Sequence, residues 1–434
     1  KPRHPMLTPE DNDLLTRVGP GTPMGRFMRE HWLPALTSSE LPTPDSDPLR
    51  VMLLGEQLIA FRDANGSVGL IQNNCPHRGA SLFFGRNEEA GLRCVYHGWK
   101  FDVTGQCVDM PNEPAESNFK TRVRQGAYPC RDYGGMIWTY MGPRSAPPEL
   151  PKLEWANVPD DQRSLSPVLR ECNWVQALEG DIDTAHLYFL HARLNPDEGR
   201  TPQNDQGVFH EDRHPRLFLV DMPYGLMYGA RREEDPETYY WRITQFMFPF
   251  HTYFPPGGFQ GIPGHIWVPL DDENTMVWSV AYNPLEPIPV RQQWQRANGP
   301  QYLPTTTASL GRWRASANKT NDYMINREVQ RTATFTGIPT IPMQDQAVTE
   351  SMGPVMDRTN EHLGTTDAAI IQVRRKLLNA AKALRDRGIT PPGVDEPELY
   401  GVRSASVVLP RSADWLVETA ETLKAFTNLA VATA

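Results

Sequence analysis

The sequence predicts an α+β protein made of a small all-β domain and a larger domain in which helices accompany a curved antiparallel sheet. Two observations predict this division. Between residues 49 and 141, short apolar runs are separated by turn signals such as Asn65-Gly66, a pattern typical of hairpins. Beyond residue 165 the strand-like runs become longer and helix-like segments occur. The clearest of these, residues 365–388, repeats apolar residues every three or four positions and ends at a glycine.

Two proline-rich segments mark the boundaries, "LPTPDSDP" before the all-β domain and "PRSAPPELP" after it. We therefore expect an N-terminal segment over residues 1–48 that packs on the larger domain. The all-β domain is expected over residues 49–145, and the larger domain over 146–434. A chain of 434 residues is long enough for two or three domains.

Charge and composition narrow the class of partner. The net charge is −9 and no long basic run occurs, which argues against nucleic acid and anionic membranes as partners. No apolar run is long enough for a transmembrane helix, and "KPRHPMLTPEDNDLL" lacks the apolar region of a signal peptide. Five cysteines are too few, and odd in number, for a disulfide scaffold. We therefore expect a cytoplasmic protein.

Four potential metal ligands occur in two short stretches. "CPH" supplies Cys75 and His77, and "CVYH" supplies Cys94 and His97 after sixteen intervening residues. Two thiolates and two imidazoles suit a metal with a tetrahedral preference, so zinc would accept the set. A [2Fe–2S] cluster would instead take both cysteines on one iron and both histidines on the other. The residues alone leave both interpretations open.

A second histidine pair, His186 and His191, lies in the helix-like segment "CNWVQALEGDIDTAHLYFLH". Residues five apart on an ideal helix point about 140° away from each other. Both can face one ion only if the helix is distorted between them, for example by a π-type bulge. A facial triad of two histidines and one carboxylate, which binds Fe(II), fits this spacing better than a zinc helix with ligands four apart. Downstream aspartates that could complete the triad are Asp271, Asp272, Asp322, Asp345, Asp357 and Asp367.

These two motifs, in this order, resemble those of the Rieske non-haem iron ring-hydroxylating oxygenases. "CPHRG…CVYHGWKF" is similar to the family's C-x-H…C-x-x-H motif. Glu179, Asp183, His186 and His191 match its segment E-x-x-x-D-x-x-H-x-x-x-x-H. The resemblance covers about residues 20–390. It implies a Rieske [2Fe–2S] domain followed by a catalytic domain of the helix-grip type that holds a mononuclear Fe(II). The implied cluster ligands are Cys75, His77, Cys94 and His97.

The resemblance also suggests the remaining residues of the iron site. "MQDQAVTESMG" is similar to the helical segment that carries the family's carboxylate ligand, which selects Asp345; Asp357 is the alternative. Asp183 lies three residues before His186 and could simply orient that ligand. In the family, this aspartate connects the iron site to a Rieske histidine of the adjacent subunit. The resemblance therefore implies a homotrimer, or a hexamer formed by two trimers.

Segments such as "TRVGPGTPMGRFMREHWLPA" are similar to the phthalate dioxygenase branch of the family. This implies an NAD(P)H-dependent reductase partner that carries FMN and a plant-type [2Fe–2S] centre. The implied reaction is cis-dihydroxylation, with O2, of phthalate, isophthalate or a substituted benzoate. A monooxygenase or O-demethylase acting on an aromatic acid is the alternative enzyme. A zinc protein or a simple electron carrier is the alternative class, although a carrier would not need the second histidine pair.

An aromatic carboxylate requires a cation in an otherwise apolar pocket, and arginine suits this planar anion best. Arg231, Arg232 and Arg242 lie on two strands that we expect to pair through "EEDPET". Alternation along a strand sends Arg231 and Arg232 to opposite faces, so at most one of the two faces the pocket. We also expect pocket walls from Leu178, Phe189, Phe246, Phe248 and Trp278.

Overall fold

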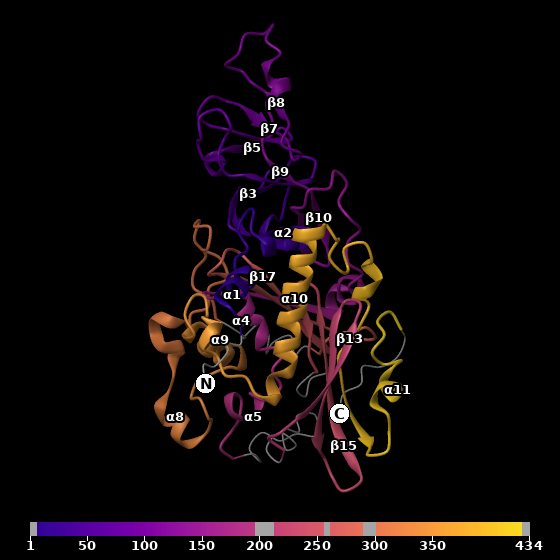
Figure 1. Cartoon of the computed structure of the whole chain (residues 1–434). Helices are drawn as coiled ribbons and strands as arrows, with labels where there is room; N and C mark the ends of the chain where they lie inside the picture. The colour runs from indigo at the N-terminus through magenta and orange to yellow at the C-terminus, as the bar shows by residue number, and fades with distance from the viewer. Residues whose placement is uncertain (1–6, 196–211, 256–260, 290–300, 428–434) are drawn as a thin grey trace. The chain divides into compact units, whose positions relative to one another are not determined.

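The computed structural model describes residues 7–195, 212–255, 261–289 and 301–427 (Figure 1). The chain forms two compact units. The smaller comprises Val18–Pro148 and Pro304–Arg312, and the larger comprises Lys1–Arg17, Glu149–Leu303 and Trp313–Ala434. Residues 18–48 thus group with the all-β unit, whereas we expected them to pack on the larger domain. The reason is strand β1 (Trp32–Thr37), which pairs with β11 (Met136–Tyr140).

The smaller unit contains three antiparallel sheets. β1 and β11 continue to β10 (Cys130–Tyr133). The second sheet has the order β2 (Leu49–Leu53), β3 (Glu56–Arg62), β4 (Val68–Gln72) and β9 (Ala127–Tyr128). The third has the order β5 (Arg86–Glu88), β6 (Gly91–Arg93), β7 (Lys100–Phe101) and β8 (Cys107–Asp109). The expected all-β character and the β3–β4 hairpin at Asn65-Gly66 are both present.

The larger unit is built on an eight-stranded sheet whose paired neighbours are all antiparallel. Its order is β12-β18-β17-β16-β15-β14-β13, and β19 pairs with β15 beside the short β16. The strands are β12 (Arg163–Arg170), β13 (Arg216–Met222), β14 (Gly225–Glu233), β15 (Thr238–Met247), β16 (His251–Tyr253), β17 (Ile262–Pro269), β18 (Thr275–Tyr282) and β19 (Ala405–Pro410). The predicted hairpin through "EEDPET" is confirmed, since β14 pairs with β15 and Ala230 lies opposite Arg242.

Helices accompany this sheet, as expected for an α+β domain. Helix α10 (Ala368–Arg387) contacts β13 and β14, and Gly388 ends it in the left-handed conformation, at φ 65°. The described residues of this unit also form α1 (Pro9–Thr16), α3 (Glu154–Asn157), α4 (Trp174–Glu179), α5 (Leu187–Leu190), α8 (Arg327–Thr332), α9 (Ile341–Ser351) and α11 (Trp415–Thr419). The smaller unit holds α2 (Pro23–Arg29). In the part of the chain that the structure describes, no helix combines the length and apolarity that crossing a bilayer requires.

The segment with the second histidine pair is not one continuous helix. Helix α4 ends at Glu179 and α5 begins at Leu187, so the expected helix with a π-type bulge is wrong. Glycine and aspartate are poor residues for a helix interior, and the intervening turn contains Gly180, Asp181 and Asp183. The Asp183 carboxylate accepts a hydrogen bond from the Ala185 amide, at 2.7 Å, which favours the turn over the helix.

Candidate metal centres and active-site cavity

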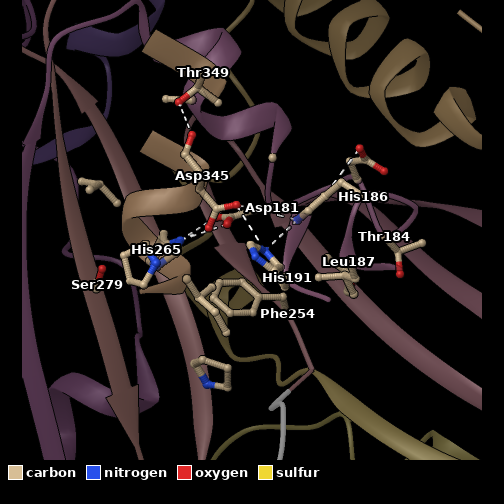
Figure 2. A pocket seen from close by; sticks show the side chains of 18 of the residues that line it. Asp181, Thr184, His186, Leu187, His191, Phe254, His265, Ser279, Asp345 and Thr349 are labelled. Atoms are coloured by element: carbon tan, nitrogen blue, oxygen red, sulfur yellow. Dashed lines mark hydrogen bonds and ion pairs between the residues drawn. The ribbon is translucent and has the colours of Figure 1, made fainter. Parts of the chain in front are cut away.

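His186, His191 and Asp345 meet in the larger unit (Figure 2). The two Nε2 atoms are 3.2 Å apart, and Oδ1 of Asp345 lies 3.3 Å from His191 Nε2 and 3.8 Å from His186 Nε2. Ligands at about 2.1 Å from one ion, at right angles to each other, would be roughly 3 Å apart. The three side chains therefore fit a single metal ion bound on one face.

The one-turn helix α5 explains how histidines five apart can converge. His186 is its N-cap and His191 its C-cap. His191 has left the helical conformation, with φ −102° and ψ 3°, so ideal-helix angles do not apply to it. Asp345 comes from α9, the helix predicted from "MQDQAVTESMG".

The other aspartates that the sequence offered as third ligand lie elsewhere. Asp271 accepts a hydrogen bond from the Glu273 amide in the β17–β18 turn. Asp357 is exposed and caps the 3₁₀ turn at 358–360. Asp367 is the N-cap of α10.

The outward nitrogen of each histidine has its own partner. Nδ1 of His186 lies 3.5 Å from Oδ2 of Asp183, and Nδ1 of His191 lies 2.7 Å from Oε1 of Gln344. Such partners fix the tautomer and leave Nε2 free for a metal. Burial would raise the pKa of Asp183, but its hydrogen bond and charge interaction with His186 outweigh burial, so the pKa lies below its usual value. Asp183 is therefore a carboxylate near neutral pH.

In the smaller unit, the two predicted cluster loops have the same backbone design. In each, the cysteine amide donates to the carbonyl five residues later, at 2.8 Å, and the cysteine carbonyl accepts from a glycine amide four residues later. The glycines, Gly79 and Gly98, have φ of 75° and 81°. A Cβ on Gly98 would also lie 2.6 Å from Pro111, so this loop requires glycine.

The four predicted cluster ligands separate into two pairs. Cys75 and Cys94 belong to the apolar core and are 2% and 3% exposed. His77 and His97 are less buried, and their ring centroids are 4.4 Å apart. Burial raises the pKa of the Cys75 thiol to about 11; the charge of Cys94 adds to the rise, and a backbone hydrogen bond from His77 opposes it. A bound metal would reverse this preference and hold both sulfurs as thiolates.

This arrangement fits a two-iron cluster better than a single zinc. Among the described residues, the group of metal-ligand atoms that lie within 4.8 Å of one another is the trio in the larger unit. The four loop ligands therefore do not converge on one point, as a tetrahedral zinc would require. Paired cysteines inside and paired histidines nearer the surface match the division of ligands in a Rieske cluster.

A cavity of about 470 Å³ opens beside the trio. This volume is in the range of small-molecule sites. Figure 2 shows the side chains of Thr184, Leu187, Phe254, His265 and Ser279 around His191 and Asp345. One wall comes from alternate residues of three adjacent strands: Ser164, Ser166, Val168 and Arg170 of β12, Val277 and Ser279 of β18, and Pro263, His265 and Trp267 of β17.

Comparisons with known proteins agree with this two-centre organisation. Residues 31–125 match the Rieske [2Fe-2S] domain family, and residues 139–432 match the family described as LigXa C-terminal domain like. The chain is 42% identical to the 3-chlorobenzoate-3,4-dioxygenase oxygenase subunit of Comamonas testosteroni, over 94% of this chain and 97% of that protein. It is 38% identical to the phthalate 4,5-dioxygenase oxygenase subunit of Pseudomonas putida, over 94% of each chain. The chain belongs to the Rieske ring-hydroxylating oxygenases.

More distant relatives extend the comparison. The 5,5'-dehydrodivanillate O-demethylase oxygenase subunit of a Sphingobium species is 32% identical, over 90% of this chain and 84% of that protein. The crystal structure of dicamba monooxygenase bound to dicamba shares the fold, with a TM-score of 0.58 at 17% identity, over 83% of this chain and all of that one. Oxygenase components of this family contain a Rieske cluster and a mononuclear iron, and they work with a reductase or ferredoxin and dioxygen.

The three arginines that were predicted to bind substrate lie in three different environments. Arg242 lines the cavity and donates to the Pro255 carbonyl at 3.1 Å. Arg232 is not part of the lining; it is buried and donates to the Thr184 carbonyl at 2.8 Å. Burial, and then the charge of Arg242, lower the pKa of Arg232 to about 10. Arg231 faces the opposite side of the sheet, where it lies 4.0 Å from the ring centroid of Tyr239.

The prediction of which residues form the cavity walls is wrong. Leu178, Phe189, Phe246, Phe248 and Trp278 are all absent from the cavity lining among the described residues. Strand alternation explains Trp278, because its neighbours Val277 and Ser279 point into the cavity. Phe189 is 48% exposed on the outer side of α5.

Sequence reasoning missed a hydrogen-bond network around Asp181. This carboxylate accepts bonds from the Thr252 hydroxyl at 2.5 Å, the Trp267 indole at 2.6 Å and Nδ1 of His265 at 2.9 Å. Thr252 and His265 are partners in the β16–β17 pairing. The network therefore attaches the turn that carries Asp183 and His186 to the sheet, and it orients His265 in the cavity wall (Figure 2).

Sequence reasoning also missed Arg170, the last residue of β12, which lines the cavity and is 4% exposed. Its signal was the alternation "SLSPVLR", in which Ser164, Ser166, Val168 and Arg170 share one face. The alternation alone does not say whether that face meets a core, a cavity or solvent.

Proposed function

We propose that this oxygenase dihydroxylates an aromatic carboxylate such as phthalate, isophthalate or a substituted benzoate. Both atoms of O2 are added to adjacent ring carbons, with two electrons and two protons, and a cis-dihydrodiol forms. The observation that carries the proposal is the cavity beside the His–His–Asp trio, which combines apolar walls with the buried arginines Arg170 and Arg242. The two relatives at 42% and 38% identity, which are named for 3-chlorobenzoate and phthalate, support the same class.

We propose that His186, His191 and Asp345 hold the mononuclear Fe(II), and that Cys75, His77, Cys94 and His97 hold the Rieske cluster. The iron would supply the open coordination positions at which dioxygen is reduced. The chain supplies the ligand geometry, the tautomers fixed by Asp183 and Gln344, and an apolar enclosure that limits access of water.

Asp183 has a second proposed role, as the link through which electrons reach the mononuclear site from a Rieske histidine of a neighbouring subunit. Its carboxylate contacts ligand His186 and is one-quarter exposed, so one side remains accessible. This role requires a homotrimer or hexamer. A reductase with FMN and a plant-type [2Fe–2S] centre is the proposed electron donor. A cytoplasmic location would suit an NAD(P)H-dependent system.

O-Demethylation or monooxygenation of an aromatic acid is the second candidate function. The relative named as an O-demethylase supports it, at a lower identity than the two dioxygenase subunits. The same iron site and cavity would serve either reaction, so the products must separate the two.

The experiment is turnover of the purified oxygenase with a reductase of the phthalate dioxygenase type. The substrate panel contains benzoate, 3-chlorobenzoate, the three phthalate isomers and methoxybenzoates. Mass spectrometry after reaction with ¹⁸O2 should show two labelled atoms in a cis-diol product. Formaldehyde and a phenol from a methoxybenzoate would favour the demethylase instead. Failure of every aromatic acid, with both metal centres loaded and the reductase active, would contradict the substrate class.

A further inference from the structure

Arg170 differs from the other buried arginines of the described chain. Arg358 and Arg374 pair with Glu179, Arg403 pairs with Glu154, and Arg232 and Arg242 donate to main-chain carbonyls. The guanidinium of Arg170 has neither a hydrogen bond nor an ion pair with any described residue, and its buried Nε has no acceptor. The guanidinium lies 5.7 Å from the centroid of the Trp267 ring.

The position of Arg170 on β12 directs its side chain into the cavity. Residues two apart on a strand share a face, and Val168, Ser166 and Ser164 also line the cavity. Across the sheet, Val168 lies beside Val277, and Val277 lies beside Trp267. These three side chains form an apolar row next to Arg170. The row is large and apolar enough to cover one face of an aromatic ring.

A buried cation without a counterion is costly, and a nearby aromatic face offsets only part of the cost. In the described part of the chain the charges of Arg170 and Asp345 interact at a distance, but the two side chains form no ion pair, and Oδ1 of Asp345 is directed at the histidines. The Arg170 donors therefore remain available to a ligand in the cavity. A planar carboxylate accepts two parallel bonds from a guanidinium, which makes it the complementary group.

We propose that Arg170 binds the carboxylate of the aromatic substrate, with the ring lying over the row formed by Val168, Val277 and Trp267. This inference rests on the proposed function and deepens it, because it assigns selectivity for acids to β12 rather than to the β14–β15 hairpin. Arg170 would hold the acid end of the substrate in the cavity that Asp345 also lines. The ring would thus be presented to the iron site in a fixed orientation.

The test is substrate binding by the metal-loaded oxygenase without oxygen, measured by calorimetry for each acid of the panel and for its neutral amide. Arg170→Gln should weaken binding of the acids by roughly 10²–10³-fold, the effect of removing one partner of a buried ion pair. Binding of the amides should change by less than about threefold. Arg170→Lys, which keeps the charge but not the planar donor pair, should fall between the wild type and Arg170→Gln.

The control is Arg231→Gln, which changes the same residue type on the opposite side of the sheet and should leave both affinities unchanged. Arg242→Gln, compared in parallel, reports on the other cavity arginine.

An equal loss for acids and amides, or loss of the mononuclear iron from Arg170→Gln, would show a structural role and overturn the inference. An Arg170→Gln variant that binds acids normally, or a wild type that binds none of them, would also overturn it. Binding requires no turnover. An oxygenase that binds acids through Arg170 but hydroxylates none of them would therefore contradict the proposed function alone.

Discussion

Oε1 of Gln344 lies 2.7 Å from Nδ1 of His191. The next residue, Asp345, approaches the other ring nitrogen, Nε2, at 3.3 Å. The Gln344 amide nitrogen donates to the Ile338 carbonyl at 3.0 Å, so Oε1 is the atom that faces the imidazole. Since Oε1 can only accept, Nδ1 of His191 donates to it, and Nε2 is the ring nitrogen that faces Asp345 and would bind a metal. One turn of α9 thus carries one candidate ligand, Asp345, and orients another, His191.

Gln344→Leu should weaken Fe(II) binding at the mononuclear site by about 10–100-fold, because a ligand histidine loses the partner that fixes its tautomer. The measurement is bound iron after dialysis against graded Fe(II), with the Rieske absorbance as an internal reference. Gln372→Leu is the matched control, since Gln372 lies at the surface of α10 and bonds to Asp221. Iron binding like that of the wild type would show that Asp345 and the backbone suffice to orient His191.

Asp183→Asn keeps the size of the side chain and removes its charge. We expect nearly normal cluster and iron content, but turnover lower by orders of magnitude, because the proposed link for electrons is interrupted. Stopped-flow oxidation of the reduced cluster in the presence of substrate and O2 measures this step directly. Loss of iron from the variant, with full activity once iron is resupplied, would reduce Asp183 to a support for His186.

Asp181→Asn tests the network that attaches the ligand-bearing turn to the sheet. An asparagine offers one acceptor oxygen and a donor amide to three donors, from Thr252, His265 and Trp267. At least one charged hydrogen bond is lost, so the free energy of unfolding should fall by about 1.5–3 kcal/mol. Urea denaturation of the metal-loaded oxygenase measures the change. Asp221→Asn, at a carboxylate that is 70% exposed, should change stability by no more than about 0.5 kcal/mol. Equal stability of the two variants would remove the anchoring role of Asp181.

The sequence named candidate ligands most directly where they are close in the chain or carry a local signal. Cys75 and His77 lie within one loop, and Cys94 and His97 lie within another. Each loop contains a glycine with positive φ, which indicates a turn. Helix α10 was predictable because its apolar stripe and its terminal glycine are local features. The α4–α5 break was not predicted, because apolar residues on both sides of the turn masked the low helix propensity of Gly180 and its neighbouring aspartates.

Long-range pairing limited the prediction of the cavity. Gln344 contacts a histidine 153 positions away in the chain, and Asp181 contacts Thr252 and His265 across 71 and 84 positions. Alternation could place Arg231 and Arg232 on opposite faces, but it could not say which arginine bordered the cavity. That depends on where α5 and α9 cover the sheet. Arg242 and Arg170, on strands four apart in the sheet order, both line the cavity for that reason.

His77→Cys tests the assignment of ligands in the smaller unit. A thiolate in place of a neutral imidazole adds a negative charge to the cluster and should lower its reduction potential, by on the order of 100 mV or more. A redox titration followed by electron paramagnetic resonance measures the potential. Arg78→Gln, at the exposed neighbour of His77, is a control for a change of charge without a change of ligand. A wild-type protein that is colourless and holds one zinc in place of iron and sulfide would contradict the cluster itself.

Glu179, the first residue of the second family motif, has a structural role that can be measured by its pH dependence. Its carboxylate is buried between Arg374, at 2.6 Å, and Arg358, at 3.3 Å. Burial would raise the pKa of Glu179, but the charges and hydrogen bonds of the two arginines outweigh it, so the pKa lies below its usual value. A lowered folded-state pKa means that the carboxylate adds stability above the unfolded pKa of about 4.3, and that this stability is lost as pH falls through the folded-state pKa.

Glu179→Gln should therefore lower the free energy of unfolding by about 3–5 kcal/mol at pH 7, since it leaves two arginines buried without their shared counterion. The difference between variant and wild type should narrow as the pH falls from the unfolded-state pKa of about 4.3 towards the lower folded-state pKa, because the unfolded wild-type chain binds a proton there that the folded carboxylate does not. Urea denaturation at a series of pH values gives both quantities. Glu328→Gln removes an exposed partner of Arg331 and should cost about 1 kcal/mol or less at every pH. If the cost of Glu179→Gln did not vary with pH, the shape of the side chain rather than its charge would account for the stability. The side chain of Glu179 would then stabilise the protein by packing at the end of α4.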